Sequence, residues 1–132
     1  MLADTTPMPT LPAADLDRAR KFYEGTLGLP VAMEVPGMVL YRSGNTMLML
    51  YESAYAGTSQ ATAATWNVGD FDAEVSRLRD SGVHFETYDL PDTEWDDGVA
   101  TSAGGAMRAV WFKDPEGNIL AVGTMPDASL AT

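Results

Sequence analysis

The 132-residue sequence contains no cysteine and only one histidine, His84. The lack of cysteine excludes disulfides, thiolate metal sites and cysteine nucleophiles together. No apolar run approaches the length of a membrane-spanning helix, and residues 1–7 lack the basic-then-apolar pattern of a signal peptide. These absences predict a cytoplasmic protein that does not enter a membrane.

Basic residues are also scarce. Eight lysines and arginines stand against nineteen acidic residues, and thirteen of those acids lie in residues 67–132. The resulting net charge of −11 repels nucleic-acid phosphates and anionic lipid, so neither is an expected partner. A cationic small molecule would be attracted, although the same excess of acid also serves solubility alone.

Hydrophobic residues make up 45% of the sequence, which is enough for one folded domain with a core. Residues 111–122 predict a hairpin, because aromatic and branched residues flank an Asp-Pro-Glu-Gly turn at 114–117. A shorter copy occupies residues 39–50, and both copies place Gly-Asn at the turn. The chain therefore contains one structural unit twice.

The order of elements repeats as well. Asp15 and Asp70 are each predicted to cap a helix with an apolar stripe, and Gly28 and Gly82 end these helices. Each half then gives strand, helix and three strands, over about residues 8–52 and 62–123, with a linker at 53–61 and a tail at 124–132. In the second half, a strand is expected at 83–89 and a long acidic loop at 90–105. We predict one α+β domain of two βαβββ modules forming a cupped mixed sheet with a cleft.

Several runs resemble a known family. Asp15–Tyr23 (DLDRARKFY) with Leu27–Leu29 (LGL) resembles the first-module signature of the vicinal oxygen chelate superfamily. Val68–Ala73 (VGDFDA) and Phe112–Asn118 (FKDPEGN) resemble its second module. That superfamily includes glyoxalase I, extradiol dioxygenases, fosfomycin resistance enzymes and bleomycin resistance proteins. The resemblance covers about residues 8–123 and implies this glyoxalase/bleomycin-resistance fold and a homodimer, but not one function, because the superfamily hosts metalloenzymes and metal-free binders.

The resemblance also implies where a metal would be held. The four ligand positions fall here on Met8, on Leu48 or Met49, on Ala63 and on Ala121. Thioether and hydrocarbon side chains do not bind the hard or borderline divalent ions that these enzymes use. We therefore expect no metal and no other cofactor.

Strand alternation predicts which side chains line the cleft, and core packing is the alternative for each of them. The result is an apolar and aromatic pocket in which methionines adapt to an irregular ligand. Trp95 lies among six acids at 86–97, where it either clamps a planar cation or anchors a solvated loop. The predicted ligand-binding residues are Met8, Thr10, Met47, Met49, Tyr51, Ala63, Thr65, Asn67, Trp95, Trp111 and Ala121.

The sequence leaves three classes of function open. The first and favoured class is metal-free binding or sequestration of an aromatic or cationic small molecule, without catalytic residues. The second is a metal-independent isomerase, cyclase or lyase that uses cleft carboxylates, His84 or a tyrosine. The weak catalytic candidates are the pair His84 and Glu86, which share a strand face. That pair is also explained as two exposed residues at a strand end. The third is a scaffold whose cleft serves only dimerisation.

Overall fold

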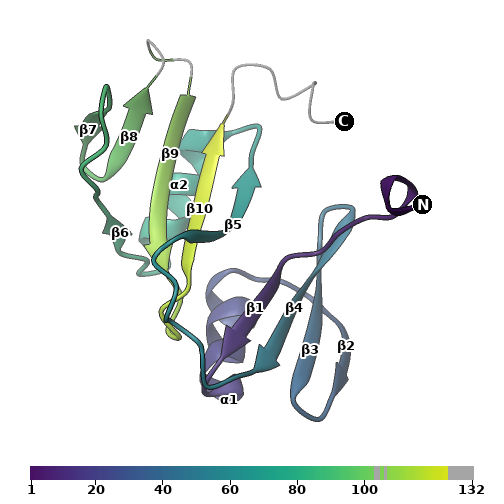
Figure 1. The fold of residues 1–132 in the computed structure, drawn as a ribbon. Coiled ribbons are helices and arrows are strands. Elements are labelled where there is room, and N and C mark those ends of the chain that lie inside the picture. Colours follow the sequence, from purple (N-terminus) through teal and green to yellow (C-terminus); the bar gives the residue numbers. More distant parts are fainter. Residues whose placement is uncertain (103–104, 106, 125–132) are drawn as a thin grey trace. The chain divides into compact units, whose positions relative to one another are not determined.

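A computed structural model describes residues 1–102, 105 and 107–124 of the chain (Figure 1). The chain forms two compact units: residues 1–63 with 114–118, and residues 64–113 with the described residues from Ile119 onward. The helices are a short 3-10 turn at Leu2–Asp4, α1 (Leu16–Arg20), a π-helix at Lys21–Thr26 and α2 (Phe71–Asp80). The strands are β1 (Thr10–Ala13), β2 (Val31–Val35), β3 (Met38–Ser43), β4 (Thr46–Glu52), β5 (Thr62–Asn67), β6 (Phe85–Glu86), β7 (Glu94–Asp96), β8 (Val99–Ser102), β9 (Met107–Lys113) and β10 (Ile119–Thr124).

The first unit contains a four-stranded sheet in the order β1-β4-β3-β2. β1 runs parallel to β4, and the other pairs are antiparallel. Alternate residues bury one face of this sheet with the helical segment, which contributes Ala19 and Tyr23. The buried residues of the strands are Leu11, Ala13, Val39, Tyr41, Leu48 and Leu50.

The predicted first helix is present but changes its winding. Asp15 caps it, with its side chain accepting a hydrogen bond from the Arg18 amide, as the sequence indicated. From Lys21 the segment becomes a π-helix, in which the Leu27 amide donates to the carbonyl of Phe22. This segment buries Tyr23 completely.

The second unit has strand order β5-β10-β9-β8-β7, with β6 also paired to β9. Asp70 caps α2, and Gly82 follows it with φ +85°. α2 buries Phe71, Val75 and Leu78 along one stripe. Within the described part of the chain, no helix has both the length and the apolar character that crossing a membrane requires.

The prediction of an acidic loop at 90–105 is wrong, because the described part of this segment contains a β-hairpin. β7 and β8 pair antiparallel around Asp97 and Gly98, both at positive φ, as in a two-residue turn. The strand predicted at 83–89 is correspondingly short and comprises only Phe85–Glu86. β6 and β8 pair with different parts of β9, whereas β3 of the first unit has β2 alone at that edge. The two halves are therefore not strict copies, although the α+β class is confirmed.

Candidate functional site

In the first unit, the sheet face opposite the helical segment carries a group of methionines. The strand register aligns Thr10 with Met49, and Met49 with Leu40. Tyr51 lies on the same face two residues further along β4, and Met47 two residues before. The register thus brings four predicted residues together, while Met8 lies just before β1 and is exposed.

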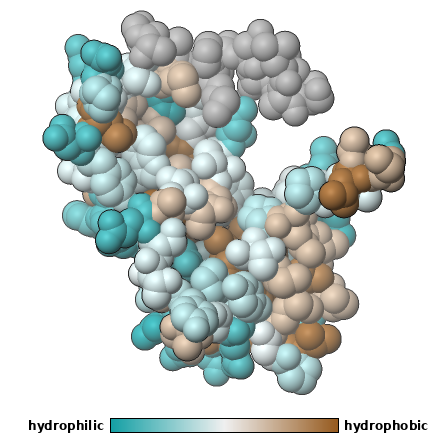
Figure 2. Space-filling model, viewed as in Figure 1, coloured by the Kyte–Doolittle hydropathy of each residue, from teal (hydrophilic) through white to brown (hydrophobic). Residues whose placement is uncertain are grey.

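This surface, which we call the methionine face, is larger than the sequence reading indicated. Met38 pairs with Tyr51, and β2 adds Met33 beside Leu40 and Val35 beside Met38. Met33 and Val35 remain 48% and 46% exposed. Figure 2 shows apolar side chains gathered over the strands of this unit. The antiparallel register through the Gly44-Asn45 turn was the signal that would have added β3 to the site.

The register separates the two residues of β4, Leu48 and Met49, between which the resemblance left the second metal-ligand position open. Leu48 pairs with Tyr41 on the buried face and is only 2% exposed. Met49 lies on the methionine face next to Thr10. We therefore take Met49 as the residue at this implied position.

In the second unit, the rings of Tyr88 and Trp95 both contact the ring of Trp111. Trp111 lies on β9, opposite Ala121 of β10 and Glu86 of β6. The ring of Trp95 lies 5.9 Å from that of Trp111, tilted by 47°, and Tyr88 meets Trp111 edge-on, also at 5.9 Å. Both tryptophans are half-buried, whereas Ala121 is buried. We call Tyr88, Trp95 and Trp111 the aromatic cluster. The predicted ligand-binding residues did not include Tyr88, which falls in the strand expected at 83–89; in the structure it lies after β6, which ends at Glu86.

The acids around Trp95 do not all face its ring. Trp95 lies on β7, and strand alternation turns Glu94 and Asp96 to the opposite face. Glu86 does share the face of Trp111, but its carboxylate lies 3.6 Å from the ammonium of Lys113. The aromatic cluster therefore offers aromatic rings to a ligand, and the carboxylates of Glu94, Asp96 and Glu86 add little negative charge to it.

The remaining predicted residues lie on or beside short strands. On β5, Ala63, Thr65 and Asn67 are exposed, while the alternate residues Ala64 and Trp66 are less so. His84 is exposed immediately before β6, and among the described residues the ion-pair partner of Glu86 is Lys113 rather than His84.

A groove of about 640 Å3 lies elsewhere in the first unit and contains none of the predicted site residues. Its lining includes Asp17, Glu52 and Arg20. The Arg20 guanidinium is paired with Glu24 and Glu34 at 2.7 Å each. The groove is thus acidic, with its one arginine already engaged.

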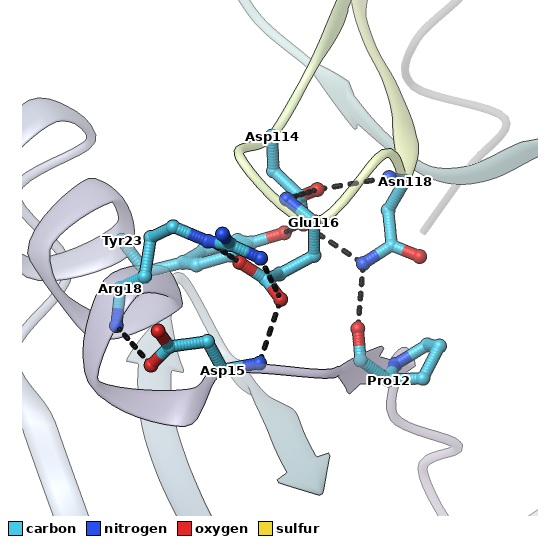
Figure 3. A network of polar contacts seen from close by, with 7 residues as sticks. All are labelled: Pro12, Asp15, Arg18, Tyr23, Asp114, Glu116 and Asn118. Atoms are coloured by element: carbon cyan, nitrogen blue, oxygen red, sulfur yellow. Dashed lines mark hydrogen bonds and ion pairs between the residues drawn. The ribbon is translucent and has the colours of Figure 1, made fainter. Parts of the chain in front are cut away.

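The Asp-Pro-Glu-Gly-Asn turn joins β9 to β10 but packs as part of the first unit (Figure 3). Asp114 is buried and accepts four hydrogen bonds. Its Oδ1 atom accepts from the amides of Glu116 and Asn118, and its Oδ2 atom accepts from the Asn118 side chain and, at 2.6 Å, from the Tyr23 hydroxyl. Asn118 also donates to the carbonyl of Pro12 at 2.8 Å. Asp114 therefore holds the turn, the helical segment and β1 together.

Glu116 makes a second connection from the same turn. Its Oε1 atom accepts from the Asp15 amide at 2.8 Å, and its carboxylate takes a bidentate contact from Arg18 at 2.6 and 3.1 Å. The hydrogen bonds from Arg18, followed by that from Asp15, hold the pKa of the Glu116 carboxyl below its ordinary value against the opposing effect of burial. Burial and the charge of Asp114 raise the pKa of Tyr23, which keeps its hydroxyl a donor. These acids are structural, as the turn chemistry indicated.

Gly117 and Gly57 allow the linker to lie against this turn. Both have positive φ, and a Cβ added to Gly57 would approach the Glu116 carbonyl oxygen to 2.6 Å. A Cβ on Gly117 would meet the Gly57 Cα at 2.9 Å. Only glycine fits at either position without moving the backbone.

The four positions that the resemblance implies for metal ligands supply no nitrogen or oxygen ligand from a side chain. Met8 and Met49 carry thioethers, and Ala63 and Ala121 carry methyl groups. Among residues 1–102, 105 and 107–124, no group of three or more His, Asp or Glu residues is placed to hold a metal ion. The residues present do not fit a divalent metal at these positions.

Comparison with known proteins tests the resemblance. A search of curated protein sequences finds no significant match. Among solved structures, a lactoylglutathione lyase from Agrobacterium tumefaciens is similar, with 21% identity, a TM-score of 0.69, and coverage of 92% of this chain and 93% of that one. A bleomycin-binding protein complexed with bleomycin has 18% identity, a TM-score of 0.68, and coverage of 91% and 98%. A fosfomycin resistance protein from Listeria monocytogenes, complexed with Mn(II), has 12% identity, a TM-score of 0.66, and coverage of 92% and 90%.

These neighbours share the fold, although one is a lyase, one binds bleomycin and one confers fosfomycin resistance. The model of the Glyoxalase/Bleomycin resistance protein/Dioxygenase superfamily matches residues 6–122, which is nearly the whole described chain. The resemblance drawn from the sequence motifs is therefore confirmed. The chain belongs to the Glyoxalase/Bleomycin resistance protein/Dioxygenase superfamily.

Proposed function

We propose that this chain binds a small aromatic molecule without a metal. The observation that carries the proposal is the aromatic cluster, in which two half-buried tryptophans and a tyrosine meet on one sheet face. Aromatic rings of this kind bind planar ligands by offset or edge-on stacking. The methionine face supplies a second apolar surface that adapts to irregular shapes. The predicted residues on each surface are proposed as ligand contacts of that unit, each unit taken separately.

The metal-free part of the proposal rests on side-chain chemistry. Methyl and thioether groups occupy the positions that the resemblance implies for metal ligands, and neither group is a ligand for zinc or manganese. The Mn(II)-bound fosfomycin resistance neighbour is thus a poor functional guide. The bleomycin-bound neighbour supports a ligand-binding role, since it has the same fold.

We propose that the ligand is recognised by its aromatic rings rather than by a positive charge. The net charge of −11 attracts cations in general, but Glu94 and Asp96 face away from the Trp95 ring and Glu86 is paired with Lys113.

For the assembly, we propose a homodimer in the cytoplasm, with no nucleic-acid or membrane partner. Light scattering of the purified protein measures its oligomeric state.

A thermal-shift screen of aromatic compounds, followed by calorimetric titration of each hit, tests the proposal. Replacing Trp111 by alanine is expected to weaken binding at least ~30-fold, the effect typical of a central aromatic contact. Tyr55→Ala is the matched control, because Tyr55 is 78% exposed and lies outside both surfaces.

Two results would contradict this function. If a hit is converted to product, and Glu86→Gln or His84→Ala abolishes turnover while binding persists, the protein is a metal-independent enzyme. If no compound raises the melting temperature, the surfaces serve assembly alone.

A further inference from the structure

The Tyr88 hydroxyl is a buried polar group that nothing in the described chain pairs. Its oxygen is inaccessible to solvent and has no hydrogen-bond partner among the described residues, although the residue as a whole is only half-buried. Buried hydroxyls are nearly always hydrogen-bonded, because leaving one unpaired costs its full desolvation. The described residues contain no other side-chain atom of this kind. An unpaired group that the fold retains needs a reason.

Its surroundings suggest that reason. The Tyr88 ring meets Trp111 edge-on, and Trp111 in turn contacts Trp95. Burial, followed by the charge of Glu86, raises the pKa of the Tyr88 hydroxyl, which therefore keeps its proton. Tyr88 thus carries a protonated hydroxyl, a hydrogen-bond donor, on a ring that meets the indole of Trp111 edge-on.

We propose that Tyr88 is a specificity-determining residue that donates a hydrogen bond to an acceptor atom on the edge of a planar heteroaromatic ligand stacked on Trp111. This inference rests on the proposed function and names the ligand class for the aromatic cluster. A flat hydrocarbon would satisfy the tryptophans but leave the hydroxyl unpaired. A ring nitrogen or a carbonyl satisfies both, and discrimination by an unpaired polar group of the site is stronger than discrimination by shape.

The hydroxyl is covered in the unbound protein, so the ligand reaches it only after a side chain turns aside. We propose Trp95 as that side chain, because its ring contacts Trp111, the ring on which the ligand would stack. It lies on β7, which is the last strand in the order β5-β10-β9-β8-β7 and is paired only to β8 along that path. Its ring meets that of Trp111 at a tilt of 47° rather than in a parallel stack. In this proposal, rotation of Trp95 exposes the part of Trp111 that its ring contacts, and the ligand takes that place.

Two probes of the same shape test the hydrogen bond. Isoquinoline and naphthalene differ by one ring nitrogen, and at pH 8 both are uncharged. Binding is followed through the indole N–H resonances of Trp95 and Trp111, with Trp66 as the internal reference, in the wild type, Tyr88→Phe and Tyr55→Phe. The preference for isoquinoline over naphthalene is expected to fall about 3- to 10-fold in Tyr88→Phe, the value of one neutral hydrogen bond, and to stay unchanged in Tyr55→Phe.

A second readout separates this role from a structural one. Removing an unpaired hydroxyl relieves a cost in the free protein, so Tyr88→Phe is expected to raise the melting temperature by about 2–5 °C while weakening isoquinoline binding. A lower melting temperature would mean that the hydroxyl is paired in the free protein, by a bound water for example, and would overturn the proposal.

The binding outcomes also distinguish this inference from the function beneath it. If both probes shift Trp95 and Trp111 but their ratio is the same in Tyr88→Phe, the role of Tyr88 is refuted and aromatic binding stands. If neither probe shifts these resonances, the ligand class is refuted, while the screen with Trp111→Ala decides the function separately.

Discussion

Replacing Asp114 with alanine is expected to destabilise the protein by about 3–5 kcal/mol, a large fraction of the stability of a domain this size. Asp114 accepts hydrogen bonds from two backbone amides, the Tyr23 hydroxyl and the Asn118 side chain, and it is buried. Alanine removes the acceptor of all four hydrogen bonds, and of the four donors the Asn118 side chain keeps its second hydrogen bond, to the Pro12 carbonyl. Tyr23 is fully buried, so its hydroxyl has no route to solvent without unfolding. Urea unfolding followed by circular dichroism measures the loss.

Two variants separate this effect from loss of charge alone. Asp114→Asn keeps one acceptor oxygen in the turn and is expected to cost less than Asp114→Ala, about 2 kcal/mol. Asp89→Ala removes an exposed acid and is expected to change the free energy of unfolding by less than about 0.5 kcal/mol. Equal stability of Asp114→Ala and wild type would show that the turn does not organise the first unit.

Replacing Glu116 with glutamine is expected to lower the free energy of unfolding by about 2–4 kcal/mol at pH 7. The same change is expected to make the free energy of unfolding less dependent on pH in the acidic range. The Glu116 side chain is buried and accepts from Arg18 and the Asp15 amide. Because Arg18 holds the pKa of Glu116 below its ordinary value of 4.5, this carboxylate stabilises the fold above that pH. The stabilisation is lost as the pH falls through the lowered pKa, when the carboxyl takes up a proton.

Unfolding measured between pH 7 and pH 3 tests the sign of this effect. The gap between wild type and Glu116→Gln is expected to narrow on acidification, since both side chains are then neutral. Glu74→Gln is the control, because Glu74 pairs with the exposed Arg77 within α2 and contributes little. A gap that widens at low pH would contradict the assigned role of Glu116.

The sequence predicted the α+β class and the elements of the first half well, because local signals there agree. Asp15 and Gly28 bound the helical segment, and the Gly44-Asn45 turn fixes the register of β3 and β4. The π-helical winding of Lys21–Thr26 left no signal, since its apolar spacing also fits an α-helix.

The second half was harder to predict because acidic residues, which are uncommon in strands, occupy β7. Glu94, Asp96 and Asp97 suggested a solvated loop, yet Asp97-Gly98 is a strong signal for a two-residue hairpin. Once β7 is recognised, Trp95 falls on the same sheet as Trp111. The contact of Tyr88 with Trp111 is a long-range packing event that no local pattern encodes.

The most direct test is the metal content of the purified protein, measured by mass spectrometry after incubation with zinc, manganese, iron and nickel and removal of excess ions. Since Met8, Met49, Ala63 and Ala121 provide no nitrogen or oxygen ligand, we expect less than ~0.1 ion per chain, with aromatic ligands still bound. One tightly held divalent ion per chain, required for ligand binding or turnover, would contradict the account.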